Sequence, residues 1–335
     1  MRLQSEVTNK FMNFAAKVAE MVRLGIHADT IRANMLTGGE IFLLLEDSDT
    51  DFNLIQQRFG TLKVFTTLAE VNAAVTTNRN DVVLMSAVNE HSTAMVTISK
   101  NRVHFQSLDG ANGRKNSQGT KVATPATDVA ASVAVVSNTG TRNTFRNIKF
   151  IQQGTNVAQT SGFIDTGEGT YCEGCEFEVN SILTTVTQGL LFKGDTCHYK
   201  NCQFGNSTVY HTAANQAPLV IQTPARYSYF ENCTMINYSD KTSASCIDAP
   251  DTDSVIGWIK FENCSLVCAN LGNGATAGAT IAEGVTNAGT SGYLMFDNRC
   301  TSYNCGKFAE TVAYTLNAAP AGAATAGGGK AVAGA

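Results

Sequence analysis

The chain has 335 residues, of which 43% are hydrophobic and 16% are charged, and its formal net charge is −4. This composition excludes a disordered chain, and the small negative charge gives no electrostatic basis for binding nucleic acid. No stretch approaches the roughly 18 uncharged apolar residues of a spanning helix, so we expect neither nucleic acid nor a membrane as a partner.

Residues 3–24 carry the pattern of an amphipathic helix. Its apolar residues recur at intervals of four and three, the spacing of a coiled-coil seam. They are Val7, Phe11, Phe14, Val18 and Met21. Such a helix lies either on its own domain or against symmetry mates in an assembly. The first six residues lack the basic and then apolar layout of a signal peptide, so we expect synthesis and folding in the cytoplasm.

The next segments predict strands and one short helix. Residues 40–45 form an apolar run typical of a buried strand. Thr67 and Glu70 form a capping box, which predicts a short helix directly after them. Residues 81–85, 95–98 and 103–110 then indicate three strands separated by turns.

A hexapeptide returns about every 30 residues in the middle of the chain. Its copies are Phe145–Phe150, Cys172–Phe177, Tyr199–Phe204, Phe230–Met235 and Phe261–Leu266. A fixed period of this length indicates a solenoid. The runs are short and rich in aromatic or β-branched residues, without helical periodicity, so each period predicts one coil of a β-helix.

Stacking the copies predicts three columns, of which the first is aromatic-rich. The second is small and apolar and contains Cys175, Cys202, Cys233 and Cys264. The third is polar and contains Asn147, Asn201, Asn232 and Asn263. Asparagine tolerates a left-handed backbone, and its amide can bond to an asparagine one coil away, so we expect this column to form a ladder of bends. A second apolar run precedes each hexapeptide, which predicts at least two parallel strands per coil.

The chain resembles a known superfamily from about residue 61 to residue 310. The order of short helix, Asp81-Val-Val-Leu strand, Val-Thr-Ile strand, Lys100-Asn101 turn and Val103-His-Phe strand, followed by coils containing Asn-Cys, is similar to the pectate-lyase-like proteins. The resemblance implies an all-β, single-stranded right-handed parallel β-helix. It does not imply one activity, because the superfamily includes lyases, polygalacturonases, phage tailspikes and phage capsid-surface proteins.

All ten cysteines lie between Cys172 and Cys305. A column of reduced thiols explains them best, because free cysteine behaves as a small buried hydrophobe. Zinc or redox chemistry at Cys172-x-x-Cys175 and disulfides stay open as alternatives.

The sequence offers no catalytic constellation. Asp165, Asp248 and Asp251 are the best-placed carboxylates for cleaving a polysaccharide, but their neighbours predict solvated turns. The signatures of polygalacturonases are missing, and the five histidines suggest no triad. We therefore expect a protein that is not an enzyme and has no metal or cofactor.

Residues 317–335 consist almost entirely of small residues and are typical of a flexible arm. Ordering on a partner and a disordered end are both compatible with this composition. Ala318 and Pro320 represent this arm among the expected attachment residues, together with the seam of the N-terminal helix.

These observations predict three regions: an attachment region at 1–60, a β-helix at 61–310 and an Ala/Gly-rich arm at 311–335. The favoured function is that of a bacteriophage virion protein, a homotrimeric decoration or head-fibre-like protein that stabilises the capsid through the major capsid protein. It would be assembled in the host cytoplasm and located on the capsid surface. The alternatives are a tailspike-type polysaccharide-degrading enzyme and an adhesin that binds host surface glycans through Tyr210, Tyr227 and Tyr229.

Overall fold

The computed structural model describes residues 31, 36–45, 63–85, 89–91, 94–107, 120–124, 133–154, 157–180, 186–213, 216–239, 241, 244–250, 254–268, 280–283, 292–303, 307–309 and 313–315. The predicted N-terminal helix and residues 316–335 of the predicted Ala/Gly-rich arm lie outside these ranges, and so do seven expected attachment residues. These are Val7, Phe11, Phe14, Val18, Met21, Ala318 and Pro320.

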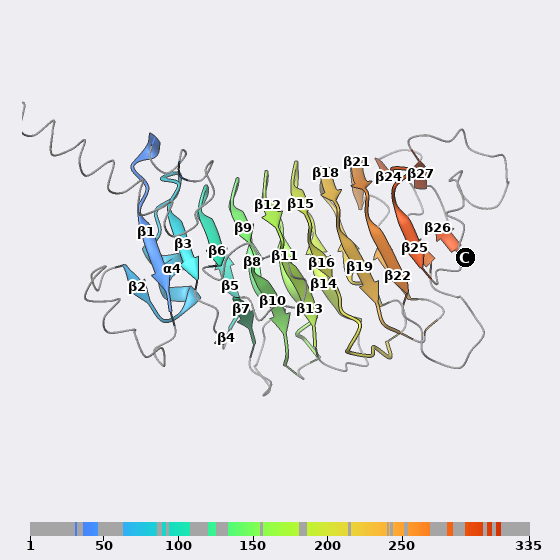
Figure 1. The fold of residues 1–335 in the computed structure, drawn as a ribbon, viewed down its shortest axis with the longest axis horizontal. Coiled ribbons are helices and arrows are strands. Elements are labelled where there is room, and N and C mark those ends of the chain that lie inside the picture. The colour runs from blue at the N-terminus through green and yellow to red at the C-terminus, as the bar shows by residue number, and fades with distance from the viewer. Residues whose placement is uncertain are drawn as a thin grey trace, which may run out of the picture.

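The strands form three parallel sheets that run along the length of the molecule (Figure 1). Sheet A contains, in spatial order, β2 (Val64–Phe65), β1 (Ile41–Leu44), β3 (Val82–Met85), β6 (His104–Ser107), β9 (Thr144–Arg146), β12 (Tyr171–Glu173), β15 (His198–Lys200), β18 (Ala225–Glu231), β21 (Val255–Glu262), β24 (Gly292–Phe296) and β27 (Ala313–Thr315). Sheet A thus includes strands on both sides of the predicted 61–310 range.

Sheets B and C have eight strands each. Sheet B contains β4 (Asn89–His91), β7 (Lys121–Ala123), β10 (Lys149–Gln152), β13 (Glu176–Val179), β16 (Gln203–Phe204), β19 (Thr234–Asn237), β22 (Ser265–Cys268) and β25 (Thr301–Tyr303). Sheet C contains β5 (Val96–Ile98), β8 (Ala134–Asn138), β11 (Ser161–Asp165), β14 (Gln188–Phe192), β17 (Leu219–Ile221), β20 (Ser245–Asp248), β23 (Thr280–Glu283) and β26 (Lys307–Ala309).

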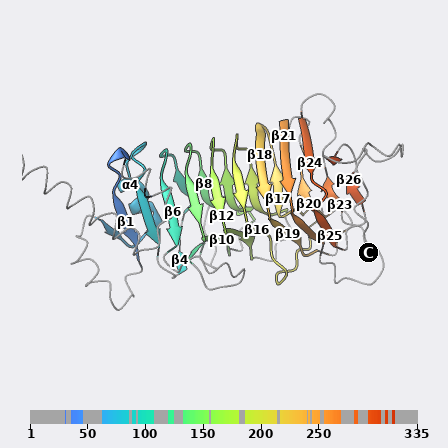
Figure 2. The same ribbon diagram turned by 45° about the horizontal axis from the view of Figure 1, so that its top comes forward.

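Each coil contributes one strand to every sheet, in the order C, A and B. In one coil the chain passes from β11 to β12, bends at Gly174 and continues into β13. Each of these strands then pairs in parallel with its equivalent in the next coil (Figure 2). The predicted right-handed parallel β-helix is therefore confirmed, with three strands per coil.

The core consists of side chains stacked in register between coils. The stack of sheet A is formed by Phe105, Phe145, Cys172, Tyr199, Phe230, Phe261 and Phe296. The ring centroids of Phe230 and Phe261 are 5.0 Å apart, and those of Phe261 and Phe296 are 4.7 Å apart. Aromatic pairs of this kind add roughly 0.5–1.5 kcal/mol beyond the area that they bury, so every coil stabilises the next.

The bend between sheets A and B has a left-handed backbone in successive coils. Its φ values are 55° at Asn147, 64° at Gly174, 53° at Asn201, 53° at Asn232 and 51° at Asn263. Nδ2 of Asn263 donates to Oδ1 of Asn232 at 2.7 Å. Glycine and asparagine adopt this conformation more readily than other residues, which explains why the repeat carries them at this position.

The thiols next to these bends form a second ladder. Each Sγ lies close to a carbonyl oxygen one coil back, at 3.4 Å from Cys175 to Phe145, 3.6 Å from Cys202 to Cys172, 3.4 Å from Cys233 to Tyr199 and 3.2 Å from Cys264 to Phe230. Burial raises the pKa of the Cys202 and Cys233 thiols. The nine cysteines in the described part of the chain are buried and form no disulfide.

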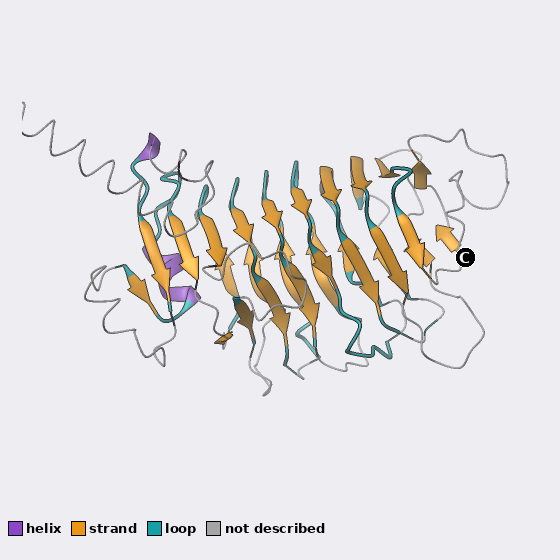
Figure 3. Ribbon diagram, viewed as in Figure 1, coloured by secondary structure: helices purple, strands orange, loops and turns teal. Residues whose placement is uncertain are grey.

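Helix α4 (Leu68–Ala74) lies beside β1 at one end of the stack (Figure 3). The predicted capping box is present, since Thr67 and Glu70 each accept a hydrogen bond from the other's backbone N–H. Leu68, Val71 and Val75 belong to the same apolar core as the coils. The helix therefore covers the first coils and shields their apolar ends from water.

Candidate functional site

Sheet A presents two rows of side chains to its outward face, because successive residues of a strand point to opposite sides. The first, which we call the aromatic row, is His104, Thr144, Tyr171, His198, Tyr229, Lys260 and Met295. The second, the charged row, is Gln106, Arg146, Glu173, Lys200, Glu231 and Glu262. The parallel register holds equivalent positions of neighbouring coils about 4.8 Å apart.

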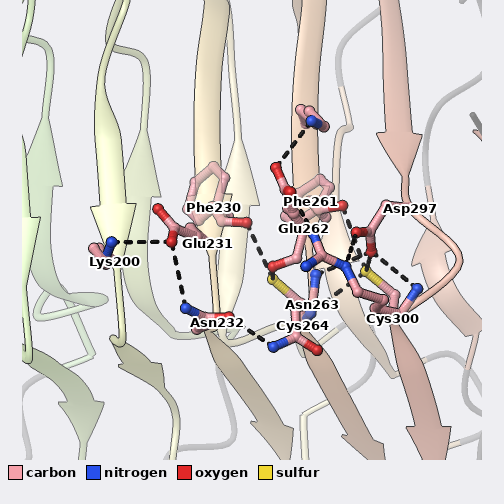
Figure 4. A network of polar contacts seen from close by, with 12 residues as sticks. Lys200, Phe230, Glu231, Asn232, Phe261, Glu262, Asn263, Cys264, Asp297 and Cys300 are labelled. Carbon is pink, nitrogen blue, oxygen red and sulfur yellow. Dashed lines mark hydrogen bonds and ion pairs between the residues drawn. The ribbon is translucent and has the colours of Figure 1, made fainter.

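Ion pairs hold the carboxylates of the charged row, both between coils and within one strand (Figure 4). Lys200 Nζ lies 3.0 Å from Oε1 of Glu231, and Lys260 Nζ lies 2.9 Å from Oε2 of Glu262. Arg299 contacts the other oxygen of Glu262 and also binds Asp297 at 2.7 Å. Glu231 and Glu262 are neighbours in register, and these cations offset the repulsion between their carboxylates.

The same contacts keep the carboxylates ionised. The hydrogen bond from Lys200, followed by that from His198, lowers the pKa of Glu231. The hydrogen bond from Lys260, with a smaller contribution from Arg299, lowers the pKa of Glu262. The row therefore presents fixed acceptors and donors to solvent, a surface suited to hydroxyl-rich ligands.

His198 lies between two tyrosines of the aromatic row. Its ring centroid is 5.4 Å from that of Tyr171 and 6.0 Å from that of Tyr229, with the rings edge to face. Nε2 of His198 lies 3.0 Å from Oε2 of Glu231, and the histidine side chain is 35% exposed. The result is an imidazole that a carboxylate orients on a solvent-facing surface, an arrangement able to accept and donate protons.

A β-bulge interrupts the pairing of β18 with β21, the two strands that follow the His198 strand in sheet A. Tyr227 in β18 stands opposite two residues of β21, Gly257 and Trp258, because the register shifts between Arg226 and Ser228. The φ angle is 47° at Tyr227 and 81° at Gly257. A left-handed tyrosine costs roughly 1–2 kcal/mol, and bulges of this type often redirect a side chain next to a functional site.

The bulge gathers three aromatic rings, which we call the aromatic corner: Tyr227, Tyr229 and Trp258. The ring of Trp258 lies 4.8 Å from that of Tyr229 and 5.8 Å from that of Tyr227. Tyr227 is 42% exposed and Tyr229 is 39% exposed. Ser228 faces the interior, where its Oγ accepts the N–H of Cys197 at 3.0 Å, so the core holds the bulge from behind.

The predicted catalytic carboxylates do not meet. Asp165 is the last residue of β11, and its side chain is fully buried and faces the interior. It therefore does not lie in a solvated turn. Its carboxylate accepts hydrogen bonds from Tyr199 Oη at 2.5 Å, Asn138 Nδ2 at 2.9 Å, the Gly167 N–H at 2.9 Å and Thr170 Oγ1 at 3.1 Å. Burial raises the pKa of Asp165, although these hydrogen bonds act in the opposite direction. The prediction of a solvated turn at Asp165 was therefore wrong, because strand alternation turns its side chain inward.

Asp248 lies at the end of β20 and is partly exposed on the outward side of sheet C. Three strand spacings, about 14 Å, separate it from Asp165 in that sheet. Asp251 lies outside the described residues. Among the described residues, no group of three His, Cys, Asp or Glu side chains could hold a metal ion.

Of the three tyrosines expected to bind sugar, only Tyr227 and Tyr229 lie together. The ring of Tyr210 instead packs against that of Tyr238, 5.4 Å away. Sequence reasoning missed the candidate residues His198, Glu231, Trp258 and Lys260. For His198, Glu231 and Lys260 the signal was the position directly before or after a residue of the aromatic-rich column, which strand alternation turns outward. Trp258 lies three residues before Phe261, in the same outward phase.

The sequence matches no protein-family profile and no curated protein. The structure is similar to pectin methylesterase from Aspergillus niger, with 14% identity, 88% of this chain and 91% of that chain covered, and a TM-score of 0.55. It is also similar to pectin methylesterase PemA from Erwinia chrysanthemi, with 13% identity, 85% and 92% coverage and a TM-score of 0.49. Pectate lyase Pel9A follows with 11% identity, 82% and 79% coverage and a TM-score of 0.40.

These similarities correct one expectation of the sequence analysis. The chain was expected not to be an enzyme, and this is contradicted, because the solved proteins that share its architecture include a pectin methylesterase. No helix in the described part of the chain is long and apolar enough to cross a membrane. The chain has the right-handed parallel β-helix fold of the pectate-lyase-like proteins.

Proposed function

We propose that the protein binds an extended polysaccharide along the outward face of sheet A and modifies or cleaves it there. The observation that carries this proposal is the pair of rows on that face. Aromatic rings recur at the coil spacing from β12 to β18, and ion-paired side chains recur from β12 to β21. A sugar chain has a similar periodic character, with an apolar face on each ring and hydroxyls at its edges.

Three coils supply both kinds of contact. Tyr171 and Tyr229 flank His198, and Trp258 extends the aromatic surface into the next coil. Beside them, Lys200 and Glu231 are each about one-third exposed. Aromatic rings can stack on pyranose rings while ion-paired groups hydrogen-bond to sugar hydroxyls, so one ligand can engage both rows.

The proton-transfer groups on this face are His198 and Glu231. Glu231 stays ionised because Lys200 also donates to it, so its carboxylate orients the imidazole. We assign His198 as the base that takes a proton from water or a sugar hydroxyl, and as the acid that returns it to the leaving oxygen. The structural neighbours act on pectin according to their names, which makes pectin the first substrate to test.

The test measures binding and turnover on one polysaccharide panel: pectin, polygalacturonate and bacterial surface polysaccharides. Binding to at least one polymer should weaken about tenfold for Tyr229→Ala, which corresponds to about 1.4 kcal/mol. Tyr303→Ala is the matched control, because Tyr303 is 70% exposed but lies on β25 in sheet B. Failure of every polymer to bind would overturn the proposal.

Turnover is followed as released methanol, acetate, reducing ends or unsaturated products. His198→Gln should lower the rate by about 10²–10⁴, the usual contribution of general acid–base catalysis, while binding is retained. Binding without any product would remove the catalytic half of the proposal and leave the binding surface.

The capsid-decoration role, the homotrimer and the location on a virion stay predictions. Their expected attachment elements, residues 3–24 and residues 316–335 of the Ala/Gly-rich arm, lie outside the described residues.

A further inference from the structure

The aromatic corner depends on a strained backbone that the packing of the core does not require. In the other described coils, the strands of sheet A pair without a register shift from β3 to β18. The bulge occurs only where Tyr227 meets Gly257 and Trp258. Its effect is to bring a second exposed tyrosine to the ring of Trp258.

Gly257 is specifically required by this arrangement. Besides its positive φ, a Cβ at this position would lie 2.3 Å from Cε1 of Tyr227. The tyrosine ring therefore lies against the glycine backbone, and its edge reaches Trp258. Both strands of the bulge, one with a left-handed tyrosine and one with a glycine, are needed to form the corner.

One cation contacts the aromatic corner, and a second directly precedes it in the chain. Lys260 Nζ lies 5.7 Å from the ring centroid of Tyr229. Arg226 precedes Tyr227, and its side chain is 45% exposed, compared with 24% for its partner Asp195. The cationic end of that ion pair is thus the more accessible to a ligand.

Lys260 can be released without leaving its carboxylate partner unpaired. Glu262 binds Lys260 through Oε2 and Arg299 through Oε1. If Lys260 turns toward a ligand, Arg299 still contacts Glu262, while it also binds Asp297. An anion at the corner can therefore recruit Lys260 while Glu262 keeps one cationic partner, whereas a neutral ligand gains nothing from the same movement.

We propose that the aromatic corner is an anchoring subsite for a sugar ring that carries a carboxylate. The ring stacks on Tyr229 and Trp258, and its carboxylate accepts hydrogen bonds from Lys260 and Arg226. This inference rests on the proposed function and narrows it to anionic polysaccharides.

The experiment uses Trp258 as its own reporter, because the chain contains one tryptophan. Its fluorescence is titrated with alginate, hyaluronate and polygalacturonate, each compared with its own methyl ester, in which the charge is removed from the same backbone. At least one anionic polymer should produce a saturable change, and its methyl ester should bind at least tenfold more weakly. The difference should shrink at high salt, which screens the ion pair.

Three variants locate the effect. Lys260→Gln should weaken binding of the anionic polymer about tenfold and leave its methyl ester unaffected, whereas Lys63→Gln, with a similarly charged but remote side chain, should change neither. Tyr227→Gly removes the ring and keeps a residue that tolerates the backbone angle, so it should weaken both ligands without unfolding the protein. Thermal unfolding followed by circular dichroism confirms that each variant is folded.

Equal affinity for each polymer and its ester, or unchanged binding by Lys260→Gln, would overturn the anionic subsite. A polymer that binds without changing the Trp258 emission would move the ligand elsewhere and also overturn it. In both cases the proposed polysaccharide function would survive. If no polymer binds by any measurement, the proposed function itself fails.

Discussion

The same strands form both sides of sheet A, but different constraints act on their inward and outward side chains. The inward side repeats one kind of side chain, so that Tyr199, Phe230 and Phe261 stack in register and are fully buried. The outward side of those strands changes from His198 to Tyr229 to Lys260. Close packing restricts what can follow in the core, whereas solvent tolerates any of these residues. The variable side is therefore where this fold can carry a specific ligand.

The largest expected effect comes from breaking the inward stack. Phe230→Ala should lower the free energy of unfolding by about 3–5 kcal/mol, because it removes a buried ring and leaves a cavity between Tyr199 and Phe261. Urea unfolding measures the change. A loss below about 1 kcal/mol would mean that the stack does not hold neighbouring coils together.

The outward side of sheet A is buried at His104, and a pH titration tests how that burial affects stability. His104 belongs to the same row as His198 but is only 8% exposed. Its Nε2 faces Oδ1 of Asn80 at 3.2 Å and its Nδ1 faces Thr144 Oγ1 at 2.8 Å. An amide oxygen only accepts, so a neutral ring with its proton on Nε2 satisfies both partners.

Burial, with the positive charge of Arg146, lowers the pKa of His104 to about 4. Its pKa is about 6.5 in an unfolded chain, so the neutral form favours folding. The stabilisation is fully present above pH 6.5 and is lost as the pH falls toward 4, by about 3 kcal/mol. His104→Gln should flatten the dependence of unfolding free energy on pH in this window. Parallel curves for the two proteins would contradict the assignment.

The bend between sheets A and B gives an intermediate effect. Gly174→Ala places a Cβ 2.4 Å from Asn147 Oδ1 at a φ of 64°, and should cost about 1–2 kcal/mol. Gly174→Asn is the matched control, because asparagine occupies the equivalent bends with nearly the same φ. Chemical denaturation compares them, and equal stability of the two variants would show that the bend does not select its residue.

The smallest stability effect belongs to the outward side. Tyr229→Ala should lower the unfolding free energy by less than about 1 kcal/mol, since the ring is 39% exposed and fills no core space. The same substitution should weaken polysaccharide binding about tenfold, as measured by titration. Compared with Phe230→Ala, one residue away, this variant distinguishes the stability contribution of the outward side of the strand from that of the inward side. A large loss of stability would show that the aromatic corner supports the fold.

Asp165 shows why the site was harder to predict than the fold. Its neighbours in sequence, glycine and threonine, indicate an exposed turn. Whether it faces inward depends on the phase of β11, which the pairing of Phe163 with Val136 and Leu190 determines. A shift of one residue would have reversed its side, and no local pattern around Asp165 distinguishes the two phases.

By itself, the sequence determined the coil and its interior. Column residues recur every 27 or 31 positions, and buried columns and left-handed bends accept so few residue types that their repetition is visible without a structure. Tertiary structure alone decided which outward side chains meet. His198 and Glu231 are 33 residues apart, and the aromatic corner exists because β18 and β21 differ by one residue in register. Solvent imposes no repeat on such positions, so only the stacking of the coils brings them together.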